Sequence, residues 1–173
     1  MKSETMEKHK EKSPTKVSCG VITLSDSKSK DLKEGKDSDI SGKYIFTKLS
    51  EKYQVNSYEI IPDEKDQLLK SIENMIDECI DAIFLTGGTG IGSRDITIET
   101  IEPLFEKELK GFGEIFRSKT YDELGSGAIL SRATAGVYKK TLIFSMPGSP
   151  NAVKLGISIV FDELAHLKKH LKE

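Results

Sequence analysis

The sequence has no long apolar run and no strong excess of charge of either sign. No apolar stretch in its 173 residues is long enough to cross a bilayer, so we expect no membrane association. The formal net charge is −2 and no stripe of alternating basic and aromatic residues is present, so nothing favours nucleic-acid binding. The lysines near the N-terminus are not followed by an apolar segment, so we expect no signal peptide.

Cysteine and histidine are scarce, which limits the chemistry that the side chains can perform. Cys19 lies in a strand-like pattern and Cys79 in a helix-like one, and we interpret them as two buried thiols in a reducing cytoplasm. A disulfide or a metal-binding pair is the alternative. His166 and His170 are one helical turn apart, but without a third ligand nearby a solvated helix face is favoured over a metal site. No histidine is placed to activate a serine or cysteine nucleophile.

The composition that is present is that of a globular α/β protein. Hydrophobic residues are 36% and charged residues 31% of a chain whose length is typical of one domain. Residues 1–15 are lysine, glutamate and serine with almost nothing apolar, which predicts a disordered tail or, alternatively, a contact with a partner subunit. We expect residues 16–173 to form a single domain.

Strand-like and helix-like patterns alternate through the first half of the chain. We expect buried strands at 17–24, 54–61 and 81–86, and helices at 39–49, 64–80 and from 97 onward. This alternation predicts a central, mostly parallel sheet with right-handed crossovers, in a three-layer α/β/α fold. The highly charged segment 28–39 is interpreted as a loop, either a lid over a ligand or a solvated insertion.

The second half is expected to contain shorter elements. Pro103 predicts a kink or an early end of the helix that begins near 97. A further helix is expected at 111–123, then two strands at 133–138 and 141–144 joined by a turn at Lys139-Lys140. An apolar stripe from Val153 to Leu171 predicts one last amphipathic helix.

The most informative stretch is the glycine-rich segment that follows the strand at 81–86. Strand, glycine loop and helix together present backbone N–H groups to an anion, because glycine adopts positive φ and allows close approach. The hydroxyls of Thr89 and Ser93 and the charge of Arg94 would assist, and Asp95 could hold a metal ion. The loop has neither the Gly-Lys-Ser/Thr of a Walker loop nor G-x-G-x-x-G spacing. A tight turn that is merely rich in glycine is the alternative.

Aspartates follow the expected strands at the same edge of the sheet as this loop. Asp26, Asp63 and Asp95 would lie at that edge, where open α/β sheets bind ligands. Two carboxylates from separate segments beside an anion loop are what Mg²⁺-assisted phosphoryl chemistry needs. Taken singly, Asp63 and Asp95 are also explained as helix caps or solvated turn residues.

The glycine segment resembles the signature of molybdenum-cofactor biosynthesis proteins of the MogA/MoaB type, which are related to the G domain of gephyrin. The resemblance covers nearly the whole chain except the tail, in matching order. Its motifs are Leu24-Ser25-Asp26-Ser27, Asp39-Ile40-Ser41-Gly42, Ile61-Pro62-Asp63-Glu64, Thr86-Gly87-Gly88-Thr89-Gly90, Arg94-Asp95-Ile96-Thr97, Lys110-Gly111-Phe112-Gly113-Glu114, Ile129-Leu130-Ser131-Arg132 and Met146-Pro147-Gly148-Ser149-Pro150-Asn151.

The resemblance implies a molybdopterin adenylyltransferase that uses Mg²⁺ and ATP. In this family the terminal phosphate of molybdopterin attacks the α-phosphate of ATP, and a partner protein of the pathway later inserts molybdenum or tungsten. Known members are trimers or hexamers. A scaffold protein that binds the pterin without turnover is the alternative, and a domain for another nucleotide or phosphate ligand is a third possibility.

The resemblance also assigns candidate site residues by motif. Asp63 and Asp95 match the catalytic and metal-binding aspartates. The nucleotide or phosphate site would comprise Ser25, Asp26, Asp39, Ser41, Gly87, Gly88, Thr89 and Gly90. The pterin site would comprise Ser131, Pro147, Gly148 and Ser149.

Overall fold

The computed structural model describes residues 16–171. The tail expected at 1–15 lies outside the described residues. The strands are β1 (Ser18–Leu24), β2 (Gln54–Ile61), β3 (Ala82–Thr86), β4 (Lys107–Glu108), β5 (Thr134–Tyr138) and β6 (Thr141–Met146). The helices are α2 (Asp26–Lys33), α3 (Ile40–Ser50), α4 (Lys65–Asp77), α5 (Thr97–Ile101), α6 (Lys110–Leu124), α7 (Pro150–Val160) and α8 (Leu164–His170), with 3₁₀ turns η1 (Glu102–Leu104) and η2 (Gly125–Leu130).

One six-stranded sheet runs through the molecule in the order β2-β1-β3-β6-β5-β4. The four strands from β2 to β6 are parallel, whereas β5 is antiparallel to β6 and β4 to β5. The mostly parallel sheet is therefore confirmed. Strand β1 lies between β2 and β3, so the order of the strands reverses at β1. At such a switch point an open α/β sheet forms a crevice at the carboxyl ends of its strands.

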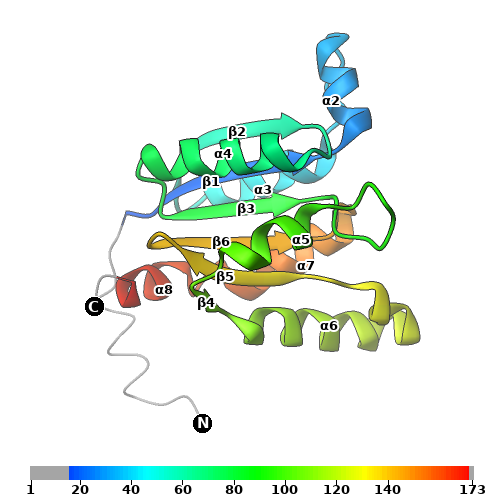
Figure 1. Cartoon of the computed structure of the whole chain (residues 1–173). Coiled ribbons are helices and arrows are strands. Elements are labelled where there is room, and N and C mark those ends of the chain that lie inside the picture. Colours follow the sequence, from blue (N-terminus) through cyan, green and yellow to red (C-terminus); the bar gives the residue numbers. More distant parts are fainter. Residues whose placement is uncertain (1–15, 172–173) are drawn as a thin grey trace.

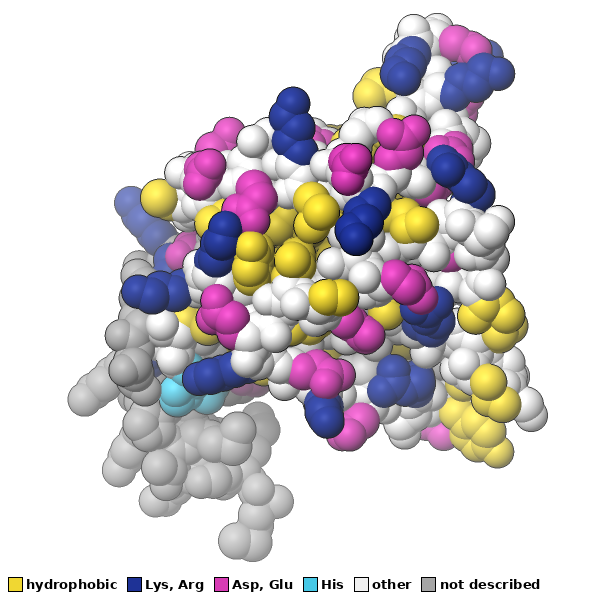
Figure 2. Space-filling view, in the orientation of Figure 1, with side chains coloured by type: hydrophobic (Ala, Val, Ile, Leu, Met, Phe, Trp, Pro, Cys, Tyr) yellow, Lys and Arg dark blue, Asp and Glu magenta, His cyan; other side chains and the backbone are white. Residues whose placement is uncertain are grey.

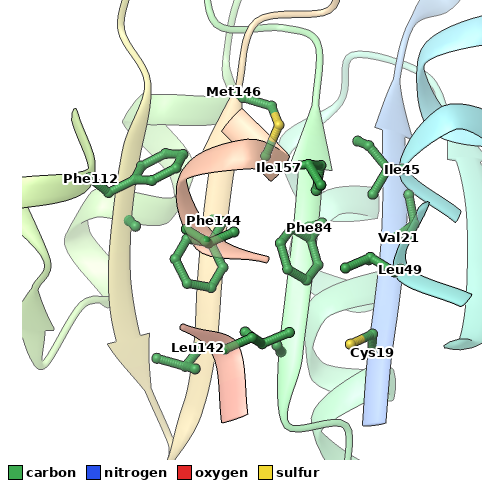
Figure 3. Packing of buried hydrophobic residues seen from close by; sticks show 14 of the residues in the cluster. Cys19, Val21, Ile45, Leu49, Phe84, Phe112, Leu142, Phe144, Met146 and Ile157 are labelled. Carbon is green, nitrogen blue, oxygen red and sulfur yellow. The ribbon is translucent and has the colours of Figure 1, made fainter. Parts of the chain in front are cut away.

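Helices cover both faces of the sheet and make the three layers (Figure 1). One apolar cluster packs α3, α6, α7 and α8 against one face, and the stacked rings of Phe84 and Phe144 lie at its centre, 5.2 Å between centroids (Figure 3). The other cluster packs α4 and α5 against the opposite face. Within residues 16–171, no helix is both long enough and apolar enough to traverse a bilayer.

The charged segment 28–39 was expected to be a loop, and this expectation is wrong for its first part, because α2 occupies Asp26–Lys33. Only Ser29 of this helix is buried, so no apolar stripe marks it in the sequence. Interactions at the two ends of α2 stabilise it instead. The Ser25 side chain caps its first turn, and Asp26 and Lys33 carry the charges that a helix dipole favours at its two ends.

The prediction of a single C-terminal helix is also wrong, because the segment forms two helices, α7 and α8. The chain bends between them at 161–163. There the carbonyl of Phe161 accepts a hydrogen bond from the Tyr53 hydroxyl, and the two rings pack edge to face at 5.5 Å. This contact comes from a residue distant in sequence, so helical periodicity does not reveal it.

The two cysteines differ in exposure, so the prediction of two buried thiols holds for Cys19 and is wrong for Cys79. Cys79 has φ = 60° and follows the end of α4. Its N–H donates to the Ile76 carbonyl and the Ile80 N–H donates to the Met75 carbonyl, which is the hydrogen-bond pattern of a Schellman cap. The left-handed residue of the cap turns its side chain to solvent, while Ile80 returns to the core.

The remaining predicted elements are confirmed. Helix α5 ends at Ile101 and Pro103 lies in the 3₁₀ turn that follows. Lys139 and Lys140 both have positive φ and form the two-residue turn between β5 and β6. The short edge strand β4 was not predicted, because its two residues are exposed and carry no apolar signal.

Candidate functional site

The glycine-rich loop joins β3 to α5 at the carboxyl end of the sheet (Figure 1). Gly87 has φ = +97°, and a Cβ there would lie 2.2 Å from the Leu24 carbonyl oxygen, so only glycine fits. The Gly87 N–H donates to the Met146 carbonyl at 3.2 Å. Thr97 closes the loop, since its hydroxyl donates to the Gly87 carbonyl at 2.8 Å and its N–H to the Gly88 carbonyl at 2.9 Å.

Between these anchors the loop leaves backbone donors open. The N–H groups of Gly88, Thr89 and Gly90 donate no hydrogen bond to any part of the chain that the structure describes. All three residues line a cleft of about 400 Å³. Successive open N–H groups in a turn that includes positive φ form a cradle for an anion. The structure therefore favours the anion-loop interpretation over a merely glycine-rich turn.

Asp95 holds the far side of this loop and does not cap the next helix. Its Oδ2 accepts the Gly92 N–H at 2.9 Å, whereas α5 has no side-chain cap. Arg132 supports the same loop, because its Nη1 donates to the Gly90 carbonyl at 2.8 Å and its Nη2 contacts Glu99. Arg132 was not predicted as a site residue.

Asp26 and Asp63 bind each other across the ends of β1 and β2. The Asp26 N–H donates to Asp63 Oδ2 at 2.9 Å, and the Asp63 N–H donates to Asp26 Oδ1 at 3.1 Å. Arg94 of the glycine loop then donates from Nε and Nη2 to the Asp26 carboxylate at 2.9–3.1 Å. Asp26 thus links the glycine loop to the segment that carries Asp63.

The pKa values of these two carboxyl groups are shifted in opposite directions. The hydrogen bond from the Arg94 guanidinium lowers the pKa of Asp26 below its ordinary value. Partial burial is the largest influence on Asp63 and raises the pKa of its carboxyl, with the negative charges of Asp26 and Asp95 adding to the rise. A cation placed beside Asp63 and Asp95 would relieve this repulsion.

Asp39 and Ser41 lie behind the cleft and do not line it. Asp39 is fully buried, and its carboxylate accepts from the Gly42 N–H at 3.0 Å, the Thr23 hydroxyl at 2.5 Å and the Tyr58 hydroxyl at 2.7 Å. Ser41 is buried as well, and its hydroxyl donates to the Gly148 carbonyl at 2.8 Å. Both residues support the walls of the site from inside.

The predicted pterin residues divide between the cleft and a neighbouring hollow of about 220 Å³. Pro147 lines both, Gly148 lines the cleft, and Ser131 and Ser149 line the hollow. Leu130 also lines both, so the two spaces meet at this leucine and Pro147. The Ser131 hydroxyl is buried without a hydrogen-bond partner among residues 16–171, which is costly unless a ligand or water completes it. Ser149 caps α7 through the Ala152 N–H.

Most of the predicted site residues are therefore brought to one place. The cleft is lined by Ser25, Asp63, Gly87, Gly88, Thr89, Gly90, Asp95, Pro147 and Gly148, with Asp26 joined to it through Asp63. Lys28 also lines the cleft and was not predicted. Lys28 lies four residues after Leu24, the last residue of β1. This spacing would have indicated a position near the cleft only if residues 26–33 had been expected to form a helix.

The donor set of the cleft fits a magnesium ion. Asp63 and Asp95 come from separate segments, and Oδ1 of each accepts no hydrogen bond from the described part of the chain. Within residues 16–171 no three metal-ligating side chains cluster, so the protein alone makes no closed cage. Mg²⁺ commonly takes one or two carboxylates and completes its shell with water and substrate phosphate oxygens.

A mostly parallel α/β sheet with open backbone N–H groups and two carboxylates at its switch point has the features of a domain suited to phosphate-bearing ligands. Residues 20–166 match the family model described as "Probable molybdopterin binding domain". The chain belongs to this family.

Known proteins are similar to the chain over nearly all of its length. Molybdenum cofactor biosynthesis protein B of Bacillus subtilis is 47% identical over 98% of each chain. Molybdopterin adenylyltransferase of Pyrococcus furiosus is 44% identical over 97% of this chain and 99% of its own. The crystal structure of the tungsten cofactor synthesizing protein MoaB from Pyrococcus furiosus superposes with a TM-score of 0.84, covering 92% of this chain and 99% of that one at 44% identity.

Proposed function

We propose that this protein is a molybdopterin adenylyltransferase of molybdenum or tungsten cofactor biosynthesis. Its membership of the family and its 44% identity to a protein named for this activity support the assignment. The structural observation that carries it is the set of open N–H groups at 88–90, in residues that line a cleft together with Asp63 and Asp95. That site suits a phosphate chain accompanied by a divalent cation.

In the proposed reaction an oxygen of the molybdopterin phosphate attacks the α-phosphorus of ATP. A new P–O–P bond forms, the bond to the β-phosphate breaks, and pyrophosphate leaves. The attacking group belongs to the substrate, so the protein needs no activated nucleophile. Its task is to orient two anionic groups and to stabilise the charge that they bring together.

The residues of the cleft divide this task. The N–H groups of Gly88, Thr89 and Gly90 would bind phosphate oxygens, and Asp63 and Asp95 would hold Mg²⁺. When bound, Mg²⁺ offsets the charge on the transferred phosphoryl group. Asp26 fixes Asp63 through their two hydrogen bonds, and Ser25, at the start of α2, would face the nucleotide.

The hollow beside the cleft would receive the pterin. It shares Leu130 and Pro147 with the cleft, so a ligand there would have its phosphate near the glycine loop. The unpaired Ser131 hydroxyl offers one hydrogen bond to a polar heterocycle, and Gly148 and Ser149 border the same path. Orienting the pterin by a few polar groups in a hollow is the usual arrangement of a ligand site.

We also propose a cytoplasmic homotrimer or hexamer that passes its product to a metal-insertion protein of the same pathway. Leu124, Ile129 and Leu130 are 60–83% exposed at the end of α6 and in η2, and Figure 2 shows apolar side chains gathered at that end of the molecule. Exposed apolar patches mark contact surfaces. Sedimentation equilibrium of the purified chain measures the number of subunits directly.

An adenylylation assay tests the function. Purified protein is mixed with molybdopterin and Mg-ATP, and pyrophosphate and adenylylated pterin are followed, with Asp95→Asn and the exposed control Asp77→Asn in parallel. We expect pterin-dependent turnover that falls about 100-fold or more in Asp95→Asn and is unchanged in Asp77→Asn. Pterin binding without turnover in the wild type would instead identify a non-catalytic scaffold of the same fold.

A further inference from the structure

Two positively charged side chains line the cleft, and they differ in what they already bind. Arg94 is occupied, because its guanidinium donates three hydrogen bonds to the Asp26 carboxylate. Using Arg94 for a substrate would break the link between the glycine loop and Asp26. The second cation, Lys28, makes no such hydrogen bonds with the described residues.

Lys28 belongs to the first turn of α2, the only part of that helix that reaches the cleft; the rest projects from the end of the sheet (Figure 1). Its side chain is 25% exposed. Among the described residues, Nζ donates no hydrogen bond, and the one carboxylate oxygen within 4 Å is Asp39 Oδ1 at 3.6 Å. That separation exceeds a hydrogen bond, so all three N–H donors of the ammonium remain available.

Asp39 does not need Lys28 as a hydrogen-bond donor. Its two oxygens already accept from Gly42, Thr23 and Tyr58. The charge of this buried carboxylate therefore holds the ammonium near the cleft wall without saturating it. A lysine held in this way is prepared for an anion that enters from the cleft, because its position is restricted before the ligand arrives.

We propose that Lys28 is a substrate-binding residue that donates to a phosphate oxygen in the cleft that it shares with the glycine loop. This inference deepens the proposed function and rests on it for the identity of the two phosphate-bearing substrates, ATP and molybdopterin. It gives the charged segment of α2 a role at the site: one lysine faces the ligand, while Lys30 and Lys33 are exposed.

Binding measured without turnover tests the inference separately from the reaction. Calorimetry with Mg-ATP and with inorganic tripolyphosphate compares wild type with Lys28→Gln, Lys28→Arg, and the controls Lys30→Gln and Lys33→Gln. We expect Lys28→Gln to weaken binding by about tenfold or more, Lys28→Arg to stay within about threefold, and the controls to match wild type. In the steady state KM should rise with little change in kcat, for ATP or for molybdopterin according to which phosphate Lys28 contacts.

A second variant separates ligand binding from neutralisation of Asp39. In the double variant Lys28→Gln with Asp39→Asn no buried carboxylate is left without its cation. Weak binding that persists in this variant supports a direct contact with phosphate, whereas recovery of wild-type affinity refutes it.

The outcomes distinguish this inference from the proposed function. Phosphate-chain affinity that depends on Lys28 without any adenylyl transfer would sustain the inference and reject the function. Adenylyl transfer whose KM values for both substrates ignore Lys28→Gln would sustain the function and reject the inference. The inference is also rejected if the wild-type protein binds neither Mg-ATP nor tripolyphosphate.

Discussion

Replacing Asp39 by alanine is predicted to destabilise the fold before it affects any ligand. The side chain is fully buried and satisfies three donors: the Gly42 N–H that it caps at the start of α3, the Thr23 hydroxyl of β1 and the Tyr58 hydroxyl of β2. Alanine removes all three acceptor contacts at once. The Thr23 hydroxyl and the Gly42 amide would then be buried without an acceptor, and the partly buried Tyr58 hydroxyl would lose its partner.

The expected cost follows from these contacts. Loss of an N-cap costs about 1 kcal/mol. A buried donor left without its partner costs about 1–3 kcal/mol, and such costs are not additive. Removing one member of a buried charged network typically costs about 3–5 kcal/mol, which we take as the estimate. At roughly 2–4 °C per kcal/mol for a domain of this size, the unfolding midpoint should fall by about 6–20 °C.

Thermal and urea unfolding at neutral pH measure this effect. Asp37→Ala is the matched control, because Asp37 lies two residues away, is exposed and forms a surface ion pair with Lys43. Its unfolding midpoint should stay close to that of the wild type. Asp39→Asn should fall between the two, because an amide oxygen can still cap Gly42. If Asp39→Ala unfolds at the wild-type midpoint yet loses Mg-ATP affinity, Asp39 is a ligand contact and the structural role is refuted.

Two further predictions concern a carboxyl and the thiols. Burial raises the pKa of Asp63, so the charge of its carboxylate is disfavoured in the folded state. This destabilising effect appears as the pH rises from the ordinary aspartate pKa through the raised one. At pH 7 Asp63→Asn should therefore unfold at a higher temperature than the wild type, while transferring no adenylyl group. If the midpoint of Asp63→Asn falls, the desolvation assignment is wrong. Burial raises the pKa of the Cys19 thiol to about 12, so a thiol reagent at pH 8 should modify Cys79 alone in the folded protein and both cysteines in denaturant. Rapid modification of Cys19 in the folded state would contradict its burial.

The parts of the fold that the sequence predicted are those that bury apolar side chains in a regular pattern. Strand β3 is a run of buried residues, and α4 places Leu68, Ile72 and Met75 on one face, so periodicity reveals both. Helix α2 and the bend after α7 were missed because other forces make them. A side-chain cap and terminal charges hold α2, and a tertiary contact from Tyr53 accompanies the bend.

The candidate site shows the same division. Residues that follow parallel strands, such as Ser25 and Asp63, were predicted to meet because strand ends share one edge of the sheet. That placement did not predict which of these residues would face a ligand. Asp39 and Asp26 occupy neighbouring motifs, yet Asp39 is buried under the site and Asp26 is held by Arg94 from 68 positions away. Such pairings depend on the tertiary packing of loops and have no local signal.

The distribution of charge across the cleft explains why a site with so few free cations can still bind two polyanionic substrates. Asp63 and Asp95 share the cleft with a loop that offers backbone N–H groups, whereas Arg94 is paired with Asp26 and Arg132 with Glu99. An anion alone would meet two carboxylates and little to offset them. A divalent cation held by those carboxylates would neutralise their charge and offer its open positions to phosphate oxygens, so the affinity of the cleft for phosphate should depend steeply on Mg²⁺. Lys28, which lines the same cleft, would then help to fix the orientation of the phosphate chain.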